Sequence, residues 1–393
     1  MKTKYFEFFS PVKICSGENA ICNIKHELEY FNSSKPLILS DAGLEKVGTV
    51  KTVLKILSKN KVDVSRLFYD IPTDSSTKTI NDIVELYTKL GADSIIALGG
   101  GSVIDTAKGV KLVLSQGTND ILKLEGNEIL PKGKTIPFVV IPTTCGTGSE
   151  CTTVAVIKNH ETHVKMEYIS PALLPDVAIL DPVVISTLPP KLVATTSLDA
   201  FTHAVEAYSC LQQNPVSSGF AISAIKLISE NLFLAVNNPK KDEYKLNLLI
   251  ASTLAGIAFS NSMVGIVHAI GHALGSYKVP HGNAMALLLP KCLEFNEPVL
   301  KDVYSELLLY FKGPEFYCSV EENLRSKTFI KEVTEFIEML SKQTGFSVKL
   351  TDYGITEENL NDIANGAIND GAAAINPKQF TRSDIVSILK KCM

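Results

Sequence analysis

Short apolar runs alternate with segments of helical period along the first half of the chain. Aliphatic and β-branched residues predict strands at residues 35–41, 66–71, 92–98, 135–141 and 177–180. Between them, residues 50–59 and 79–90 carry apolar positions three and four apart, which is the period of an amphipathic helix. Strands that alternate with helices in this way are typical of a largely parallel sheet covered by helices.

The pattern changes after Pro182. The double proline Pro189-Pro190 precedes long segments of helical period, and strand signals nearly vanish. The predicted helices cover residues 193–210, 217–235, 244–259, 283–294, 331–344 and 357–365. We therefore expect two domains, an α/β domain over residues 1–186 and an all-helical domain over residues 187–393.

Composition limits the class of protein and its partners. Of the 393 residues, 45% are apolar, enough for sizeable cores, and the net charge of −4 gives no attraction to nucleic acid or to an anionic membrane. The eight scattered cysteines, without a C-x-x-C pair, suggest reduced thiols in a cytoplasmic protein. We find no signal peptide at Met1 and no apolar run near the roughly 18 residues of a membrane-spanning helix.

A glycine-rich loop follows one predicted strand and opens a helix. Gly99-Gly100-Gly101-Ser102 lacks Cβ atoms at three positions, so the backbone can approach a ligand closely. The helix start adds unpaired N–H groups and the positive end of the helix dipole, which suit a diphosphate. The alternative is an ordinary tight turn, because the usual G-x-G-x-x-G fingerprint of dinucleotide sites is absent.

Two other strand ends carry polar residues. The segment 142–150 contains hydroxyl residues and glycines, which suit phosphate and ribose contacts but would also be explained by helix capping. Asp41 ends the first predicted strand, where a carboxylate can bind ribose hydroxyls and repel a 2′-phosphate, or can simply cap the next helix. Together the loops favour a Rossmann-like nucleotide-binding domain.

Four of the seven histidines gather in the helical half. Asp199 and His203 are four residues apart on one predicted helix, as are His268 and His272 on another, so each pair shares a helical face. His281 follows in a Pro-His-Gly turn. Each histidine alone is more often a hydrogen-bonded core residue, but together they favour an Asp/His site for Fe(II), Zn(II) or Mn(II). Such a metal could polarise an alcohol or carbonyl oxygen.

Four motifs in this order resemble one family over nearly the whole chain. They are Gly-Gly-Gly-Ser-x-x-Asp-x-x-Lys from residue 99, Pro-Thr-Thr-x-Gly-Thr-Gly-Ser-Glu from residue 142, Asp-Ala-x-Thr-His-Ala-x-Glu-Ala-Tyr from residue 199, and His-x-x-x-His with a later Pro-His-Gly from residue 268. The chain resembles the iron-containing (group III) alcohol dehydrogenases. The resemblance implies a dehydroquinate synthase-like architecture, and an NAD(H)-dependent enzyme that interconverts a small primary alcohol and its aldehyde.

The resemblance also implies roles for individual residues. Asp199, His203, His268 and His281 would bind the metal, typically Fe2+ with Zn2+ as the alternative, and His272 would be a proton relay near the nicotinamide. The implied cofactor-binding residues are Gly99, Gly100, Gly101 and Ser102 for the diphosphate, Thr143, Thr144 and Thr147 in the second loop, Val156 and Lys165 along the cofactor, and Asp41, which would favour NAD(H) over NADP(H). A homo-oligomer is also implied.

Some features leave the substrate open. His272 and His281 are nine residues apart, where the resemblance implies ten, so one residue is missing from the loop 275–279, which the resemblance places beside the substrate. A 4-hydroxybutyrate-type hydroxy acid or a diol is therefore an alternative substrate. A dehydroquinate synthase-like lyase would need several cationic residues for a phosphorylated substrate, and Lys278 is the only one close to the histidine motifs. A non-catalytic metal-binding protein would not need the nucleotide loops.

Overall fold

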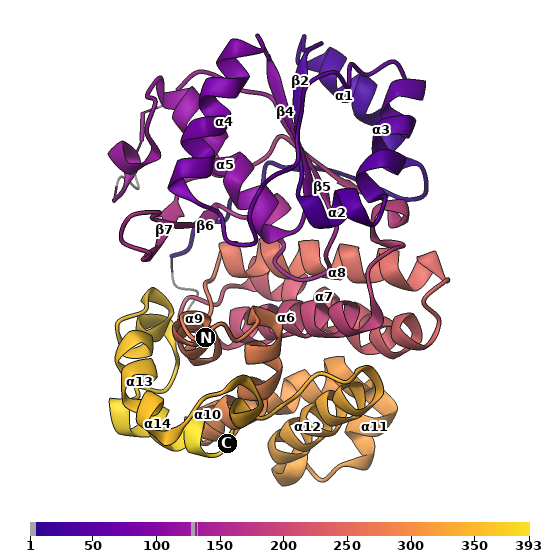
Figure 1. Ribbon diagram of the computed structural model, residues 1–393. Helices are drawn as coiled ribbons and strands as arrows, with labels where there is room; N and C mark the ends of the chain where they lie inside the picture. Colours follow the sequence, from indigo (N-terminus) through magenta and orange to yellow (C-terminus); the bar gives the residue numbers. More distant parts are fainter. Residues whose placement is uncertain (1–4, 127–129, 132) are drawn as a thin grey trace. The chain divides into compact units, whose positions relative to one another are not determined.

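The computed structural model describes residues 5–126, 130–131 and 133–393, which separate into two compact units (Figure 1). One is the α/β unit, Ser10–Leu188. The other is the helical unit, Pro189–Met393, which also includes residues 5–9. In that unit the ring of Phe8 stacks on Phe220 with 5.6 Å between centroids. The sequence pattern carries no signal for this association of the N-terminal segment.

The α/β unit is built on a six-stranded parallel sheet in the order β1-β8-β5-β4-β2-β3. Its strands are β1 (Lys13–Ser16), β2 (Pro36–Leu39), β3 (Leu67–Phe68), β4 (Ser94–Gly99), β5 (Phe138–Pro142) and β8 (Val177–Leu180). Strands β2, β4, β5 and β8 are buried along their whole length, as expected where helices cover both faces of a parallel sheet.

Helices flank this sheet on two sides. They are α1 (Ile24–Tyr30), α2 (Ala42–Lys46), α3 (Thr49–Lys59), α4 (Thr77–Lys89) and α5 (Gly101–Gln116). In Figure 1, α4 and α5 lie on one side of the sheet and α1 and α3 on the other. Leu37, Leu39 and Ile95 of the sheet share a buried cluster with Ile80 of α4 and Val110 of α5. An antiparallel hairpin, β6 (Val154–Lys158) with β7 (Lys165–Ile169), packs against α5.

The helical unit contains the long helices that the sequence pattern predicts. Its helices are α6 (Pro190–Ser209), α7 (Pro215–Asn237), α8 (Asp242–Ser260), α9 (Ile266–Gly275), α10 (His281–Lys312), α11 (Pro314–Ser319), α12 (Arg325–Thr344), α13 (Leu360–Ile368) and α14 (Arg382–Lys390). Helix α6 packs against α7, α8, α10 and α12 and is buried almost throughout from Val193 to Tyr208. Its polar side chains are therefore held inside the unit.

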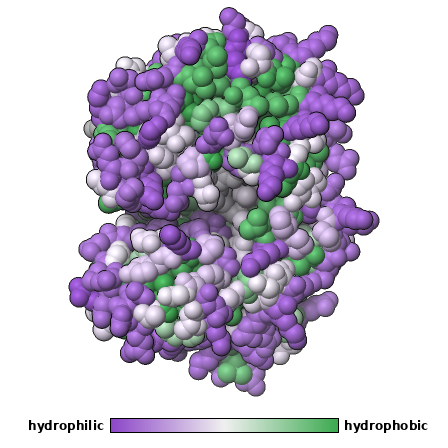
Figure 2. All heavy atoms as spheres, in the orientation of Figure 1, coloured by the Kyte–Doolittle hydropathy of each residue, from purple (hydrophilic) through white to green (hydrophobic). Residues whose placement is uncertain are grey.

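One helix bears on the expectation that no segment spans a membrane. Among the described residues, α7 alone is long and apolar enough to cross a membrane by length and composition. It reaches this mean hydropathy with polar residues interspersed and has no uninterrupted apolar run of that length. In the structure α7 packs against α6 and α8, and the surface of the helical unit on the face shown in Figure 2 is largely hydrophilic. It is therefore a core helix of this unit.

Candidate active site

The nucleotide-binding residues predicted from sequence gather at one edge of the sheet. Strands β2 and β4 are neighbours in the sheet. The chain continues from β2 to β3 on one side of this pair and from β4 to β5 on the other, so the two connections leave in opposite directions. Ligands of open α/β sheets bind at such a switch point, beyond the carboxyl ends of the strands. Asp41 follows β2, Gly99 ends β4, and Thr143 follows β5 at this same edge.

The glycine loop packs directly against the second loop. A Cβ atom on Gly100 would lie 3.1 Å from Cγ2 of Thr144, and one on Gly101 would lie 2.9 Å from Cγ2 of Thr147. The N–H group of Thr143 donates to the carbonyl of Gly99 over 3.0 Å. The two loops thus form one continuous backbone surface at the start of α5, and the glycines are explained by loop packing as well as by room for a ligand.

Asp105 of α5 fastens the second loop. One of its carboxylate oxygens accepts from the hydroxyl of Ser149 over 2.7 Å, and the other accepts from the N–H group of Val156 over 3.0 Å. Ser149 opens the short 3-10 helix Ser149–Cys151, and Val156 lies in β6. The aspartate of the glycine-loop motif therefore holds the loop that follows β5 in place through these hydrogen bonds.

Lys108, one turn further along α5, anchors the segment between that loop and β6. Its ammonium group is fully buried and donates to the carbonyl of Thr152 at 2.8 Å, to the hydroxyl of Thr152 at 2.9 Å and to the carbonyl of Val154 at 2.7 Å. Each N–H bond of the ammonium group therefore has an acceptor. Burial lowers the pKa of Lys108 to about 8, against an ordinary value of 10.5, with Asp105 opposing that shift.

The remaining cofactor candidates have partners inside the α/β unit. Asp41 accepts from the N–H group of Leu44 over 2.9 Å and caps α2, which is the structural alternative left open by the sequence. The Ser102 hydroxyl donates to the carbonyl of Thr73. Lys165 is exposed on β7, with its ammonium group 2.9 Å from the Asp74 carboxylate. A bound nucleotide would have to share or replace these contacts.

In the helical unit, three predicted ligands converge on one oxygen atom. Asp199 comes from α6, His268 from α9, and His281 is the first residue of α10 rather than part of a free turn. Oδ1 of Asp199 lies 3.7 Å from Nε2 of His268 and 3.3 Å from Nε2 of His281. One ligand atom from each residue lies within 4.8 Å of the others, a separation that one metal ion can bridge.

His203 lies beside this group. Its Nδ1 is 3.8 Å from Oδ1 of Asp199, one helical turn earlier on α6. Its ring is stacked between Phe259 and His268, with 4.3 Å between centroids on each side. The structure therefore brings Asp199, His268 and His281 together as a group, with His203 adjacent to the same carboxylate.

The residues fit a divalent cation. Oδ1 of Asp199, Nδ1 of His203 and Nε2 of His268 are buried without a hydrogen-bond partner among the described residues. A buried polar atom without a partner costs roughly 1–3 kcal/mol, so three such atoms facing one point are unusual unless something binds them. A carboxylate oxygen and neutral imidazole nitrogens suit Fe(II), Zn(II) or Mn(II).

Two of these side chains have the protonation state that a metal ion requires. Burial, the largest effect, lowers the pKa of His203 to about 3 despite the nearby Asp199, so its ring is neutral. Burial opposes ionisation of Asp199, but the neighbouring imidazoles hold its pKa well below 3.8. Burial opposes the charged form of His268, but its hydrogen bonds to Asp199 and Glu206 raise its pKa to about 9, so a metal ion would have to displace a proton from that ring.

The short interval between His272 and His281 still delivers His281 to the site. Helix α9 ends at Gly275, and the N–H groups of Tyr277 and Lys278 bond back to its last carbonyls. Lys278 adopts a left-handed conformation with φ of 61°, which turns the chain sharply enough for α10 to begin at His281. The side chain of Lys278 is exposed.

His272 is oriented by a residue that the sequence analysis missed. Its Nδ1 lies 2.9 Å from Oδ2 of Asp370, and Oδ1 of Asp370 accepts from the N–H group of Ala372. The His272 side chain is 33% exposed, whereas that of His268 is 2% exposed, so only His272 is partly open to its surroundings. Asp370 carries no spacing signal because it is 98 residues away in the chain.

Glu206 was also missed, although a signal existed. It follows Asp199 and His203 on the same face of α6, at the spacing i, i+4, i+7. Its Oε2 lies 2.6 Å from Nδ1 of His268. A third polar residue on a buried helical face that already holds two candidate ligands could have been predicted to contact one of them.

Comparison with known proteins identifies the family. A model described as iron-containing alcohol dehydrogenase matches residues 11–182, and the C-terminal model of the Fe-containing alcohol dehydrogenase family matches residues 193–393. The chain therefore belongs to the iron-containing alcohol dehydrogenase family. It is an oxidoreductase, which confirms the resemblance and favours a dehydrogenase over the lyase alternative.

Individual relatives match over the full length. The 1,3-propanediol dehydrogenase of Citrobacter freundii is 32% identical over 394 residues, with 100% of both chains covered. The NAD-dependent methanol dehydrogenase of Bacillus methanolicus is 31% identical, covering 98% of this chain and 99% of the relative. The solved alcohol dehydrogenase from Oenococcus oeni is 35% identical with a TM-score of 0.91, covering 99% and 100%. The expected fold class, an α/β domain followed by a helical domain, is confirmed.

The contact between the two loops generates a first prediction. Replacing Gly101 with Ala would place a methyl group 2.9 Å from Cγ2 of Thr147, closer than van der Waals contact, so Thr147 or the loop that carries it must shift. We expect the dissociation constant for NADH, measured by fluorescence titration, to rise at least about tenfold. Gly219→Ala on α7 is the matched control, because its Cβ meets no atom within 4 Å. Unchanged NADH binding by Gly101→Ala would contradict a diphosphate site at this loop.

The burial of Lys108 generates a second prediction. Its pKa is about 8 in the folded chain and 10.5 ordinarily, so between these pH values the unfolded chain binds more protons. Stability due to Lys108 must therefore rise with pH in this window, by about 3 kcal/mol in all at 1.36 kcal/mol per unit. The free energy of unfolding by denaturant is measured at several pH values for the wild type and for Lys108→Met. Groups that titrate alike in both proteins cancel in the difference between the two free energies. A difference that is constant from pH 8 to 10.5 would refute the burial of this charge.

Proposed function

We propose that this chain is a metal-dependent NAD(H) alcohol dehydrogenase that interconverts small primary alcohols and their aldehydes. The observation that carries the proposal is a set of buried atoms on Asp199, His203 and His268 that have no hydrogen-bond partner in the described part of the chain, with Nε2 of His281 3.3 Å from the Asp199 oxygen. An alcohol or aldehyde oxygen is the substrate group that such a centre can polarise. Family membership supplies the reaction class.

The four side chains Asp199, His203, His268 and His281 would hold the metal ion. When bound there, the ion supplies Lewis acidity toward the substrate oxygen. Fe2+ is the choice that the family name favours, with Zn2+ as the alternative, since ligand type alone does not separate them. The protein contributes a preformed arrangement, because α6, α9 and α10 fix the ligands before any ion arrives.

The α/β unit would bind the dinucleotide. The start of α5 offers N–H groups and the helix dipole to the diphosphate, with Gly100 and Gly101 as the close backbone and Thr144 and Thr147 beside them. Asp41 stands at the end of β2, where its carboxylate would favour NAD(H) over NADP(H). Relatives named NAD-dependent and NADPH-dependent both match the chain, so Asp41 alone supports this preference. The nicotinamide supplies the hydride chemistry.

His272 would move the proton. Asp370 accepts from its Nδ1–H, which leaves Nε2 as the atom that can take a proton released from the alcohol. In aldehyde reduction the same nitrogen would return it. Asp370 is thus a positioning residue, because it fixes the ring and its tautomer.

A diol is a second candidate substrate. The relative from Citrobacter freundii is named a 1,3-propanediol dehydrogenase and matches from end to end. A hydroxy acid would require a cation near its carboxylate, and Lys278 is the candidate closest to the histidine motifs in sequence. Cytoplasmic location and a homo-oligomeric state stay predictions.

An activity screen tests the reaction. Purified protein, reconstituted with Fe(II) or Zn(II), should reduce NAD in the presence of ethanol, 1-propanol, 1-butanol or 1,3-propanediol, followed by absorbance of NADH. We expect turnover with at least one alcohol and weaker turnover with NADP. A protein that retains its metal yet forms no NADH with any alcohol, diol or 4-hydroxybutyrate would overturn the proposal.

Removal of a ligand tests the metal centre. We expect His268→Ala to lose at least about tenfold in metal content, measured by elemental analysis after equilibration, and to lose turnover with it. The control is His26→Ala, since His26 lies exposed on α1. Full turnover by metal-free His268→Ala would show that the centre does not act in the reaction.

A further inference from the structure

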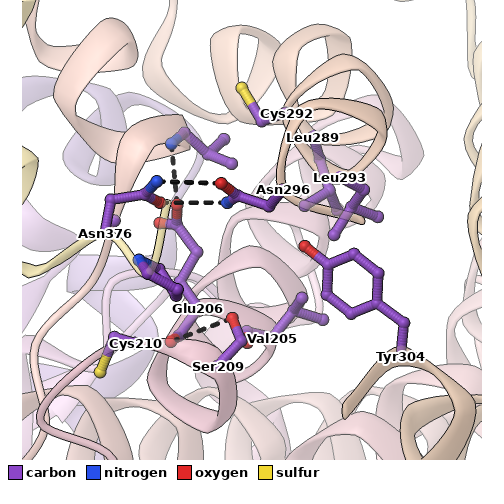
Figure 3. A pocket seen from close by; sticks show the side chains of 13 residues that line it. Val205, Glu206, Ser209, Cys210, Leu289, Cys292, Leu293, Asn296, Tyr304 and Asn376 are labelled. Atoms are coloured by element: carbon purple, nitrogen blue, oxygen red, sulfur yellow. Dashed lines mark hydrogen bonds between the residues drawn. The ribbon is translucent and has the colours of Figure 1, made fainter. Parts of the chain in front are cut away.

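A second polar network lines a small cavity in the helical unit. The cavity has a volume of about 10 Å³, and its lining includes Glu206, Asn296, Tyr304 and Asn376 (Figure 3). A volume of this size holds about one water molecule and no substrate. The polar side chains here must therefore serve the structure around them rather than a ligand of their own.

Glu206 accepts two hydrogen bonds from adjacent residues of α9. Oε1 accepts from the N–H group of Val267 over 2.8 Å, and Oε2 lies 2.6 Å from Nδ1 of His268. Glu206 is buried, at 5% exposure. A carboxylate can only accept, so in this contact Nδ1 of His268 is the donor. The other ring nitrogen, Nε2, lies 3.7 Å from Oδ1 of Asp199 and is the atom left to bind a metal ion.

Two asparagines hold the same end of α9. Asn296 and Asn376 exchange hydrogen bonds of 3.0 and 2.9 Å through their amide groups, and Oδ1 of Asn376 also accepts from the N–H group of Ile266 over 3.2 Å. A Cβ on Gly265 would lie 2.9 Å from Oδ1 of Asn376 and 3.1 Å from Oε1 of Glu206. Gly265 therefore lets both acceptors reach the first N–H groups of α9.

We propose that Glu206 is a positioning residue of the metal centre, which fixes the tautomer and the orientation of His268 and, with Asn376, holds the start of α9 in place. The inference rests on the proposed function, because it assigns Glu206 to the same metal site. Carboxylates that bind the far nitrogen of a metal-binding histidine typically contribute 10- to 100-fold in metal affinity.

The substitution Glu206→Gln tests the acceptor requirement. Glutamine has nearly the same shape, but only one of its two polar atoms accepts. If its NH2 group faces His268, Nδ1 must become the acceptor and Nε2 the protonated atom, which removes the metal-binding lone pair. If it faces Val267, that N–H group loses its partner. We expect the dissociation constant for Co(II), measured by absorption titration, and that for Zn(II), measured by competition, to rise about 10- to 100-fold.

Glu206→Asp separates positioning from packing. Aspartate keeps two acceptor oxygens but leaves a gap, so a positioning role predicts that affinity falls in the order wild type, Glu206→Asp, Glu206→Gln. A packing role predicts the reverse order for the two variants, and that result would overturn the inference. Glu306→Gln is the matched control on α10, because Glu306 accepts only from the hydroxyl of Tyr208 among the described contacts and touches no ligand. We expect it to bind Co(II) as the wild type does.

The outcomes for the wild type and the variants are distinguishable. If the wild type binds neither Co(II) nor Zn(II), the proposed function fails. If the wild type binds and Glu206→Gln binds equally well, only the role of Glu206 fails. Thermal unfolding of the metal-free proteins checks folding, and should Glu206→Gln not fold, the comparison of Glu206→Asp with the wild type decides the matter: we expect its Co(II) affinity to be lower, and equal affinity would overturn the inference.

Discussion

The candidate site depends on one carboxylate oxygen in the interior of the helical unit. Among the described residues, Oδ1 of Asp199 has no hydrogen-bond partner, and three imidazole nitrogens lie between 3.3 and 3.8 Å from it. Such a group is costly to bury, because the carboxylate loses its hydration and gains no donor. Helix α6 is held in place by packing on α7, α8, α10 and α12, so the surrounding fold keeps this oxygen where it is. A cation is the partner that relieves the cost.

The two units use the start of a helix in opposite ways. At the start of α5, Thr144 and Thr147 pack closely against Gly100 and Gly101, and the first N–H groups of the helix would face an anion. At the start of α9, the carboxylate of Glu206 and the amide of Asn376 already occupy the N–H groups. The first arrangement would take a ligand, and the second is a fixed support for His268. In both, a glycine is required by the close approach of a side chain from a distant segment.

Much of the fold could be predicted because burial leaves a clear pattern. Strands β2, β4 and β5 are continuous apolar runs, and α6 to α8 carry long apolar faces. Strand β1 was missed because it is an edge strand with mostly exposed or half-exposed residues. The hairpin β6–β7 was missed although β7 alternates exposed and buried residues, because five residues of alternation are a weak signal between loops.

The residues of the candidate site also fall into those that the sequence could indicate and those that it could not. The ligands Asp199, His203, His268 and His281 could be proposed from helical spacing and family motifs, and Glu206 shares that spacing on α6. Asp370 could not be proposed, because its relation to His272 is created only by the fold.

The short connection between α9 and α10 explains why these histidines have different environments. Because α9 ends at Gly275 and Lys278 turns the chain with a left-handed residue, His281 begins α10 and faces Asp199 directly. His272, in the last turn of α9, is left at the surface of the unit, where Asp370 rather than Asp199 binds it. The ring of His272 stacks on that of His281 with 5.7 Å between centroids. One turn of α9 therefore separates the buried His268, beside Asp199, from the partly exposed His272, beside Asp370.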